Sequence, residues 1–217
     1  MRIRCTTQKQ RGFTIVELLV ALAVFSVVLV VVTAAIIQIS RVYYKGITET
    51  QVQSTTRDIM DTISQGIQFG GGTITATPTS TTPGGSYAFC LGNQQYSYRP
   101  GYQLVDNTPG ASQTNHALVV RTVATCSGSP AQTMSGTVSG REMLSPNMRI
   151  SNLIVKNVGG NLYQVQIRVV YGDDDLLVSP SGNSNGAKAT DAACKGQAGR
   201  QFCAVSELNT VVIRRVK

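Results

Sequence analysis

Histidine is almost absent from this sequence, and His116 is the only one among its 217 residues. The five cysteines form no C-x-x-C pair, so the ligand spacing of tetrahedral zinc sites is missing. No phosphate-binding glycine loop and no nucleophile elbow occurs either. We interpret His116 as a structural or surface residue, because no cysteine or acid lies at a useful spacing from it. The sequence therefore predicts no metal, no cofactor and no catalytic residue, and a membrane-anchored enzyme is the least favoured function.

Charge is also scarce, at 14% of residues, yet the formal net charge is +8. Half of that excess lies in the first twelve residues, which contain no acid. A strong positive charge often indicates nucleic-acid binding. Here the clustering favours a membrane-topology signal. The clustered basic residues are Arg2, Arg4, Lys9 and Arg11.

Residues 13–39 form a long apolar run in which Glu17 is the only charge. As a helix this run spans roughly 40 Å, which is enough to cross a bilayer core. An ordinary secretory signal does not fit, because the run is too long and no small-residue cleavage site follows it. The basic residues before the run outweigh Arg41 and Lys45 after it, so the N-terminus is expected in the cytoplasm and the rest of the chain outside.

The front edge of this run contains Gly12, Phe13 and, four residues later, Glu17. The stretch GFTIVELLVALAVFSVVLVVV resembles the signature of type IV prepilins and type II secretion pseudopilins. In that family a membrane peptidase cuts after the glycine, and the new N-terminus is methylated. The resemblance implies a leader of residues 1–12, a cut between Gly12 and Phe13, N-methylation of Phe13 and a role in assembly for Glu17.

Physical chemistry supports a function for Glu17 in this setting. A carboxylate inside a bilayer segment is costly, so it is expected to have a partner or a task. Cutting before Phe13 creates a free amine, which on a neighbouring subunit can neutralise Glu17 when two helices pack. The alternative is a plain signal anchor with Glu17 near the membrane interface. Removing the leader also removes four positive charges that hold the chain to the cytoplasmic leaflet.

The helical pattern continues beyond the apolar run to about residue 69. Several apolar residues recur at spacings that place them on one face, and three consecutive glycines at 70–72 provide a strong stop. The predicted fold is α+β: a long N-terminal helix, transmembrane over 13–39 and amphipathic over 40–70, packed on an antiparallel β-sheet head over 71–217, as in the pilin fold. The apolar residues on this face are Val52, Ile59, Met60, Ile63 and Ile67.

The head alternates between strand-like runs and loops rich in Ser, Thr, Gly and Pro. Gly159, Gly160 and Asn161 are interpreted as the turn of a hairpin. Residues 73–86, 127–141 and 172–203 are predicted to be loops. Strands are predicted over 87–91, 95–99, 117–124, 148–155, 163–171 and 210–216.

Four of the cysteines follow the apolar run, since Cys5 lies in the leader. Four cysteines allow three pairings. The short interval between Cys194 and Cys203 favours that pair, which leaves Cys90 with Cys126. Pilins often have a cysteine-closed loop near the C-terminus, and the resemblance implies that residues 172–203 form one. Disulfides indicate an oxidising compartment.

Two further groups of residues are candidate binding sites. The carboxylates of Asp173, Asp174 and Asp175 suit calcium. A solvated turn is favoured, because three adjacent acids do not all point one way. Tyrosines interleaved with a base suggest a surface that stacks on single-stranded DNA, although tyrosine-rich strands are common in β-sheet domains. The residues of this group are Tyr87, Tyr96, Tyr98, Arg99 and Tyr102, and those of a predicted interfacial anchor are Arg41, Tyr43, Tyr44 and Lys45.

The function predicted is that of a structural subunit of a type IV pilus or related filament. Residues 141–171 are similar to minor pilins of the PilW class and pseudopilins of the GspJ class, which implies a place at the filament tip or in the assembly-priming complex. The implied partners are other pilin subunits, prepilin peptidase and the inner-membrane assembly platform. Alternatives are a major pilin, or a tip module that binds DNA or a surface.

Overall fold

The computed structural model describes residues 12–78, 85–103, 116–126, 134, 138–178, 192–196 and 199–216. Residues 1–11 of the predicted leader, and parts of the loops predicted at 73–86, 127–141 and 172–203, lie outside these ranges. The chain divides into two compact units, Met1–Tyr43 and Tyr44–Lys217, which are described separately.

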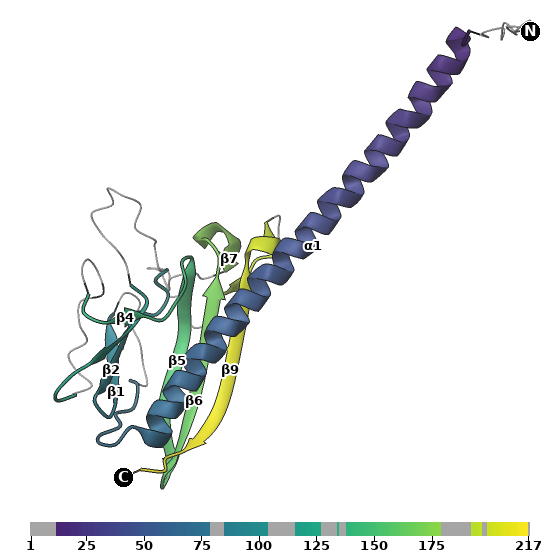
Figure 1. Ribbon diagram of the computed structural model, residues 1–217. Helices are drawn as coiled ribbons and strands as arrows, with labels where there is room; N and C mark the ends of the chain where they lie inside the picture. The colour runs from purple at the N-terminus through teal and green to yellow at the C-terminus, as the bar shows by residue number, and fades with distance from the viewer. Residues whose placement is uncertain are drawn as a thin grey trace, which may run out of the picture. The chain divides into compact units, whose positions relative to one another are not determined.

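A single helix, α1 (Ile15–Phe69), begins in the first unit and ends in the second (Figure 1). In the first unit its apolar side chains are exposed all round the helix. Hydroxyl groups in this part bond back to carbonyls of the preceding turn, as Ser26 does to Ala23 at 2.8 Å and Ser40 to Ile36 at 2.9 Å. The polar atoms of these hydroxyls are thus satisfied within the helix, as a lipid environment requires.

The part of α1 in the second unit buries one face, which confirms the predicted amphipathic half. Two threonines, Thr48 and Thr56, lie on the same face as the predicted apolar residues. The helix ends at Phe69, where the three glycines were predicted to stop it. Gly70 lies so close to the Gly66 carbonyl that a Cβ atom at this position would clash with the carbonyl oxygen. The residues buried along α1 are Thr48, Val52, Thr56, Ile59, Met60, Ile63 and Ile67.

The first sheet is antiparallel and has the order β1-β2-β3-β4. Three strands match the predicted ones to within two residues at each end. β4 was not predicted, because a two-residue strand has no period to detect. The strands are β1 (Tyr87–Leu91), β2 (Gln94–Tyr98), β3 (Leu118–Thr122) and β4 (Arg141–Glu142).

The second sheet is antiparallel, with the order β5-β6-β9 for β5 (Met148–Gly159), β6 (Leu162–Tyr171) and β9 (Ala204–Ile213). The predicted hairpin turn is present, and Gly159 and Gly160 both have positive φ. β9 begins six residues earlier than predicted. Its early part contains polar Glu207 and Asn209, which bond across the sheet to Gln166 at 2.7 Å and Gln164 at 3.1 Å.

One core joins both sheets to the second half of α1, which runs alongside β5, β6 and β9 in Figure 1. This arrangement confirms the α+β fold. The alternating residues of β6 supply the inner face of the sheet, and Phe89 and Tyr96 contribute stacked rings with centroids 4.9 Å apart. The fully buried members on β6 are Val165, Ile167 and Val169.

A small C-terminal subdomain covers one end of the second sheet. It contains the turns η1 (Asp174–Leu176) and η3 (Arg200–Phe202) and the paired strands β7 (Leu177–Val178) and β8 (Ala193–Cys194). Its own apolar cluster packs on Val170 of β6. The remaining buried members of this cluster are Leu177, Ala192 and Cys203.

Candidate processing and assembly site

The predicted cleavage site lies on non-helical backbone just before α1. Gly12, Phe13 and Thr14 are exposed and have no regular secondary structure. The Phe13 side chain is 89% exposed. A Cβ atom at Gly12 would meet nothing within 4 Å. The bond between Gly12 and Phe13 is therefore open to a peptidase without unwinding of the helix.

A capping box fixes where α1 begins. Glu17 Oε2 accepts hydrogen bonds from the Thr14 backbone amide at 2.9 Å and from the Thr14 hydroxyl at 3.1 Å. In return the Glu17 amide donates to the Thr14 hydroxyl at 3.2 Å. Thr14 is thus the N-cap and Glu17 the third helical residue, the positions at which a threonine and a glutamate satisfy the free amides of a helix start.

This second role of Glu17 went unrecognised in the sequence, although T-x-x-E before an apolar run is its signature. Neither Thr14 nor Glu17 would be lost by the predicted cut before Phe13. An acid in the first turn also suits the positive end of the helix dipole. A carboxylate has about four lone-pair positions. Within residues 12–78, the Glu17 carboxylate accepts its two hydrogen bonds through Oε2. Oε1 is therefore the oxygen on which a further cation can bind.

The apolar surface that follows is the other feature of this site. Among the described residues, α1 is the one helix long and apolar enough to span a membrane, with a mean hydropathy of 3.1 in its most apolar window and none of that window buried. Exposed apolar surface of this extent needs lipid or another protein to cover it. The site thus combines an accessible peptide bond, a fixed helix start and a long uncovered apolar helix.

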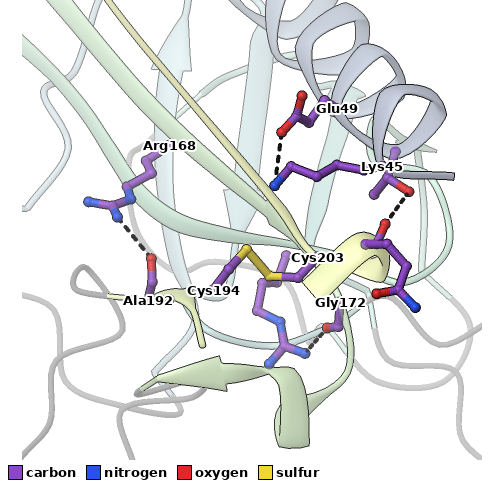
Figure 2. The surroundings of a disulfide bond; sticks show 10 residues. Lys45, Glu49, Arg168, Gly172, Ala192, Cys194 and Cys203 are labelled. Carbon is purple, nitrogen blue, oxygen red and sulfur yellow. Dashed lines mark hydrogen bonds and ion pairs between the residues drawn. A yellow bond between two sulfur atoms is a disulfide. The ribbon is translucent and has the colours of Figure 1, made fainter. Parts of the chain in front are cut away.

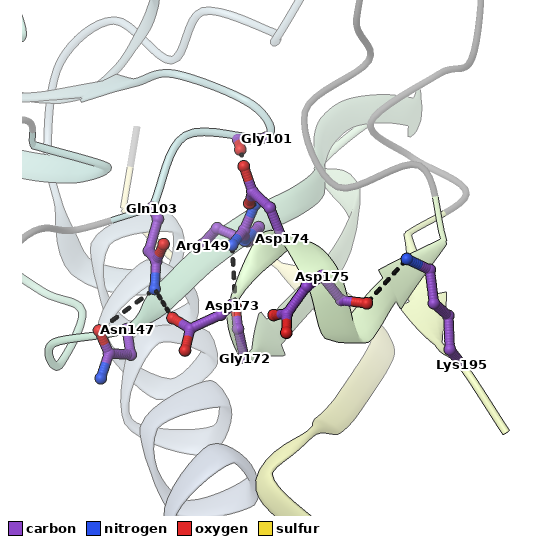
Figure 3. A network of polar contacts seen from close by, with 9 residues as sticks. All are labelled: Gly101, Gln103, Asn147, Arg149, Gly172, Asp173, Asp174, Asp175 and Lys195. Atoms are coloured by element: carbon purple, nitrogen blue, oxygen red, sulfur yellow. Dashed lines mark hydrogen bonds and ion pairs between the residues drawn. The ribbon is translucent and has the colours of Figure 1, made fainter. Parts of the chain in front are cut away.

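The three consecutive aspartates of the second unit bind protein groups (Figure 3). Asp174 Oδ1 lies 2.6 Å from Nη1 of Arg149, whose side chain is 1% exposed. Asp173 accepts from Gln103 Nε2 at 3.2 Å, and the backbone carbonyl of Asp175 accepts from Lys195 Nζ at 2.7 Å. The segment is a turn held by Arg149, Gln103 and Lys195, where the sequence favoured a solvated turn.

His116 and Glu142 lie together between β3 and β4, with Nδ1 and Oε2 3.3 Å apart. The Glu142 carboxylate also accepts from the backbone amides of Ala117 and Leu118 at 3.1 and 3.0 Å. These contacts tie the end of β3 to β4. Among the residues that the structure describes, no three His, Cys, Asp or Glu residues are grouped as metal ligands would be.

The tyrosines considered for DNA stacking are largely core residues. Tyr96 and Tyr98 are fully buried, and burial raises the pKa of the Tyr96 phenol to about 12 and raises that of Tyr98 as well. Arg99 stacks on the Tyr102 ring at 3.4 Å from its centroid. Because Tyr96 and Tyr98 cannot reach a base, the structure does not support the stacking surface that the sequence suggested.

The structure contains two disulfides, Cys90–Cys126 and Cys194–Cys203, with Cα–Cα distances of 5.9 and 5.8 Å. The second closes the loop that contains η3 beside α1 (Figure 2). There the Thr48 hydroxyl lies 3.3 Å from the Gln201 carbonyl, and Lys45 forms an ion pair with Glu49 at 3.2 Å. Near them the Tyr44 and Phe202 rings are in contact, with centroids 5.7 Å apart.

Comparison with known proteins gives one match. Residues 7–33 match the family model of the prokaryotic N-terminal methylation motif. No curated protein and no solved structure matches the chain significantly. The match includes Gly12, Phe13, Thr14 and Glu17, the residues of the predicted cleavage site and of the start of α1.

Proposed function

We propose that this chain, whose methylation motif supports its place in the type IV pilin and pseudopilin family, is a structural subunit of a type IV pilus or a related secretion pseudopilus. The motif at residues 7–33 is the observation that carries the proposal, and it supports a pilin-like subunit processed by prepilin peptidase. The fold, a long N-terminal helix with antiparallel sheets, is that expected of a pilin.

Processing removes residues 1–12. The peptidase cuts between Gly12 and Phe13, and the new amine of Phe13 is methylated. The exposed, non-helical backbone of residues 12–14 supports this step, because a peptidase needs a strand of chain that is free of helical hydrogen bonds. The capping box between Thr14 and Glu17 keeps the start of α1 intact after the cut, because Thr14 becomes the second residue of the processed chain.

Before assembly, residues 13–39 anchor the subunit in the cytoplasmic membrane with the N-terminus inside. The exposed apolar side chains and internally bonded hydroxyls of this segment support a lipid environment. Removal of the basic leader lowers the attraction to the anionic inner leaflet. The same apolar surface then packs against the helices of other subunits in the filament core.

Glu17 contributes to assembly through its charge. In a low-dielectric filament core, a carboxylate and an ammonium attract far more strongly than they do in water. The carboxylate retains room at Oε1 beside its bonds to Thr14, so the methylated amine of a neighbouring Phe13 can pair with it. This pair sets the axial position of one helix against the next.

Within the family we favour a minor subunit at the tip or in the priming complex. Support comes from the resemblance of residues 141–171, from the large head and from its two disulfides. Its partners are then other pilin subunits through α1, prepilin peptidase and the inner-membrane assembly platform.

Counting subunits in sheared, purified filaments by isotope-dilution mass spectrometry tests this proposal. A minor subunit is present in every preparation but in a small ratio to the most abundant pilin. If the chain makes up the bulk of the filament, it is a major pilin instead. If it is absent from filaments and pseudopili while abundant in the membrane, the structural role itself is refuted.

A further inference from the structure

Two exposed aromatic rings lie together at the point where α1 enters the second unit. Tyr44 is 51% exposed and Phe202, at the end of η3, is 44% exposed. Their ring centroids are 5.7 Å apart with an interplanar angle of 48°. An exposed phenylalanine beside an exposed tyrosine is a small apolar patch with a polar hydroxyl, a combination enriched where apolar and aqueous phases meet.

The position of Phe202 is fixed by contacts on each side. Thr48 bonds through its hydroxyl to the Gln201 carbonyl at 3.3 Å. Cys203, the next residue, is buried and bonded to Cys194. Gly199 has a φ of +92°, and a Cβ atom there would lie 2.8 Å from the Leu176 side chain, so a glycine is needed to turn the chain into η3.

The interior of the subdomain supports this segment as well. Arg149 donates to the Gly172 carbonyl at 2.8 Å, and a side chain at Gly172 would contact the Phe202 carbonyl at 3.3 Å. The Phe202 ring is therefore held against α1 by a disulfide, a hydrogen bond and a close backbone approach.

The distance along α1 identifies what surrounds the two rings before assembly. The apolar run ends at Ile39, and Tyr44 follows five residues later, roughly 7–8 Å along a helix axis. The headgroup layer on each side of a bilayer core is about 5–8 Å thick. With Ile39 at the outer edge of the bilayer core, Tyr44 lies at headgroup level, where aromatic side chains concentrate in membrane proteins.

The charges near the rings suit lipid phosphates. Lys45 follows Tyr44 directly, and Arg200 begins the exposed η3 turn that ends in Phe202. Glu49, one turn further along α1, is paired with Lys45 at 3.2 Å. Basic residues at this depth interact with anionic headgroups.

We propose that the edge of the C-terminal disulfide loop formed by Arg200 and Phe202 docks, together with Tyr44, into the phospholipid headgroup layer on the outer face of the cytoplasmic membrane. This contact rests on the proposed membrane anchoring of residues 13–39. It gives the subunit a second membrane contact, made by the head, and orients the head on the bilayer before the subunit enters a filament.

The absence of tryptophan from the sequence allows a direct test, because each Phe→Trp substitution makes a single-tryptophan chain. Three variants of the full chain are reconstituted in vesicles of phosphatidylcholine and phosphatidylglycerol. Phe202→Trp reports on the loop and Phe25→Trp on the membrane segment. Phe69→Trp is the matched control, because Phe69 is also an exposed phenylalanine, at 56%, with a cation near its ring, Arg215.

We expect a nitroxide on the lipid headgroup to remove about half of the emission of the Phe202→Trp chain and little from the Phe69→Trp chain. Bromine deep in the acyl chains should quench Phe25→Trp alone. We also expect the emission maximum of the Phe202→Trp chain to move to shorter wavelength when the chain is transferred from detergent to vesicles. Intact mass under non-reducing conditions verifies that both disulfides form in every variant.

Two results overturn the proposal in distinguishable ways. If Phe25→Trp is quenched from within the bilayer but Phe202→Trp behaves as Phe69→Trp does, the loop does not touch the membrane, while the anchored subunit stands. If Phe25→Trp is not quenched either, residues 13–39 do not span the membrane, and the proposed loop contact and the proposed function are both refuted.

Discussion

Glu17 accepts two hydrogen bonds from Thr14, from the backbone amide at 2.9 Å and from the hydroxyl at 3.1 Å. The residue that the family resemblance assigns to assembly is therefore also the residue that fixes the start of α1. The two roles depend on different properties, since capping needs a hydrogen-bond acceptor and subunit pairing needs a negative charge. Substitutions at Thr14 and at Glu17 therefore distinguish the capping role of Glu17 from its role in subunit pairing.

Glu17→Gln should abolish filament incorporation while cleavage continues. Glutamine at this position still completes a capping box, so the helix start is retained and only the charge is lost. Thr14→Ala is the matched control, because it removes the cap and leaves the carboxylate. We expect at least a tenfold loss of filament-bound chain for Glu17→Gln and a mild loss for Thr14→Ala, measured by immunoblot of sheared filaments. The reverse order would show that Glu17 acts through the cap alone.

Gly12→Val should leave the leader attached. A side chain at Gly12 meets no atom of the chain within 4 Å, so the substitution does not disturb the fold, and any loss of cleavage reflects recognition by the peptidase. Gly46→Ala is the control, since Gly46 is equally free of neighbours and lies outside the motif. Intact mass of each chain coexpressed with a prepilin peptidase gives the result. Full processing of Gly12→Val would refute the assigned cleavage site.

The two disulfides should contribute unequally to stability. Their sequence separations are 36 for Cys90–Cys126 and 9 for Cys194–Cys203. Loop-closure entropy then predicts a loss of roughly 4 kcal/mol for the double serine variant of the first pair and roughly 2.5–3 kcal/mol for that of the second. Guanidinium unfolding of the full chain in detergent measures both. A larger loss for the second pair would indicate that closing η3 onto α1 matters more than chain entropy.

Tyr96 and Tyr98 should resist ionisation in alkaline solution. Burial raises the pKa of Tyr96 to about 12 and raises that of Tyr98. The unfolded chain ionises near pH 10, so the folded state binds more protons above that pH and its stability falls as the pH rises. A spectrophotometric alkaline titration of the full chain should show a late phase, from Tyr96 and Tyr98, that coincides with unfolding. A single phase near pH 10 would place both tyrosines at the surface.

The long helix could be predicted almost to its ends because its determinants are local. An uninterrupted apolar run, an amphipathic repeat and three glycines define residues 13–69, and the structure gives Ile15–Phe69. The strands with clean alternation, such as β6, were found for the same reason. The early part of β9 was missed, since Glu207 and Asn209 are stabilised there by partners on β6 that lie over 40 residues away.

At the candidate site, the motif residues were readable from their spacing, and the family model matches the same residues. The capping box was overlooked although its spacing is equally plain. The buried Arg149 and its bond to Asp174 at 2.6 Å could not be inferred, because nothing local marks an arginine whose partners come from a distant turn. The burial of Tyr96 and Tyr98 was equally hidden, since aromatic residues in strands occur on either face.

The most direct test of the account is the N-terminal residue of the chain recovered from filaments. Tandem mass spectrometry of the N-terminal peptide should begin at Phe13 and be heavier than the unmodified peptide by one methylene group. Recovery of the chain in filaments with residues 1–12 still attached, or with an unmodified terminus at another residue, would contradict it.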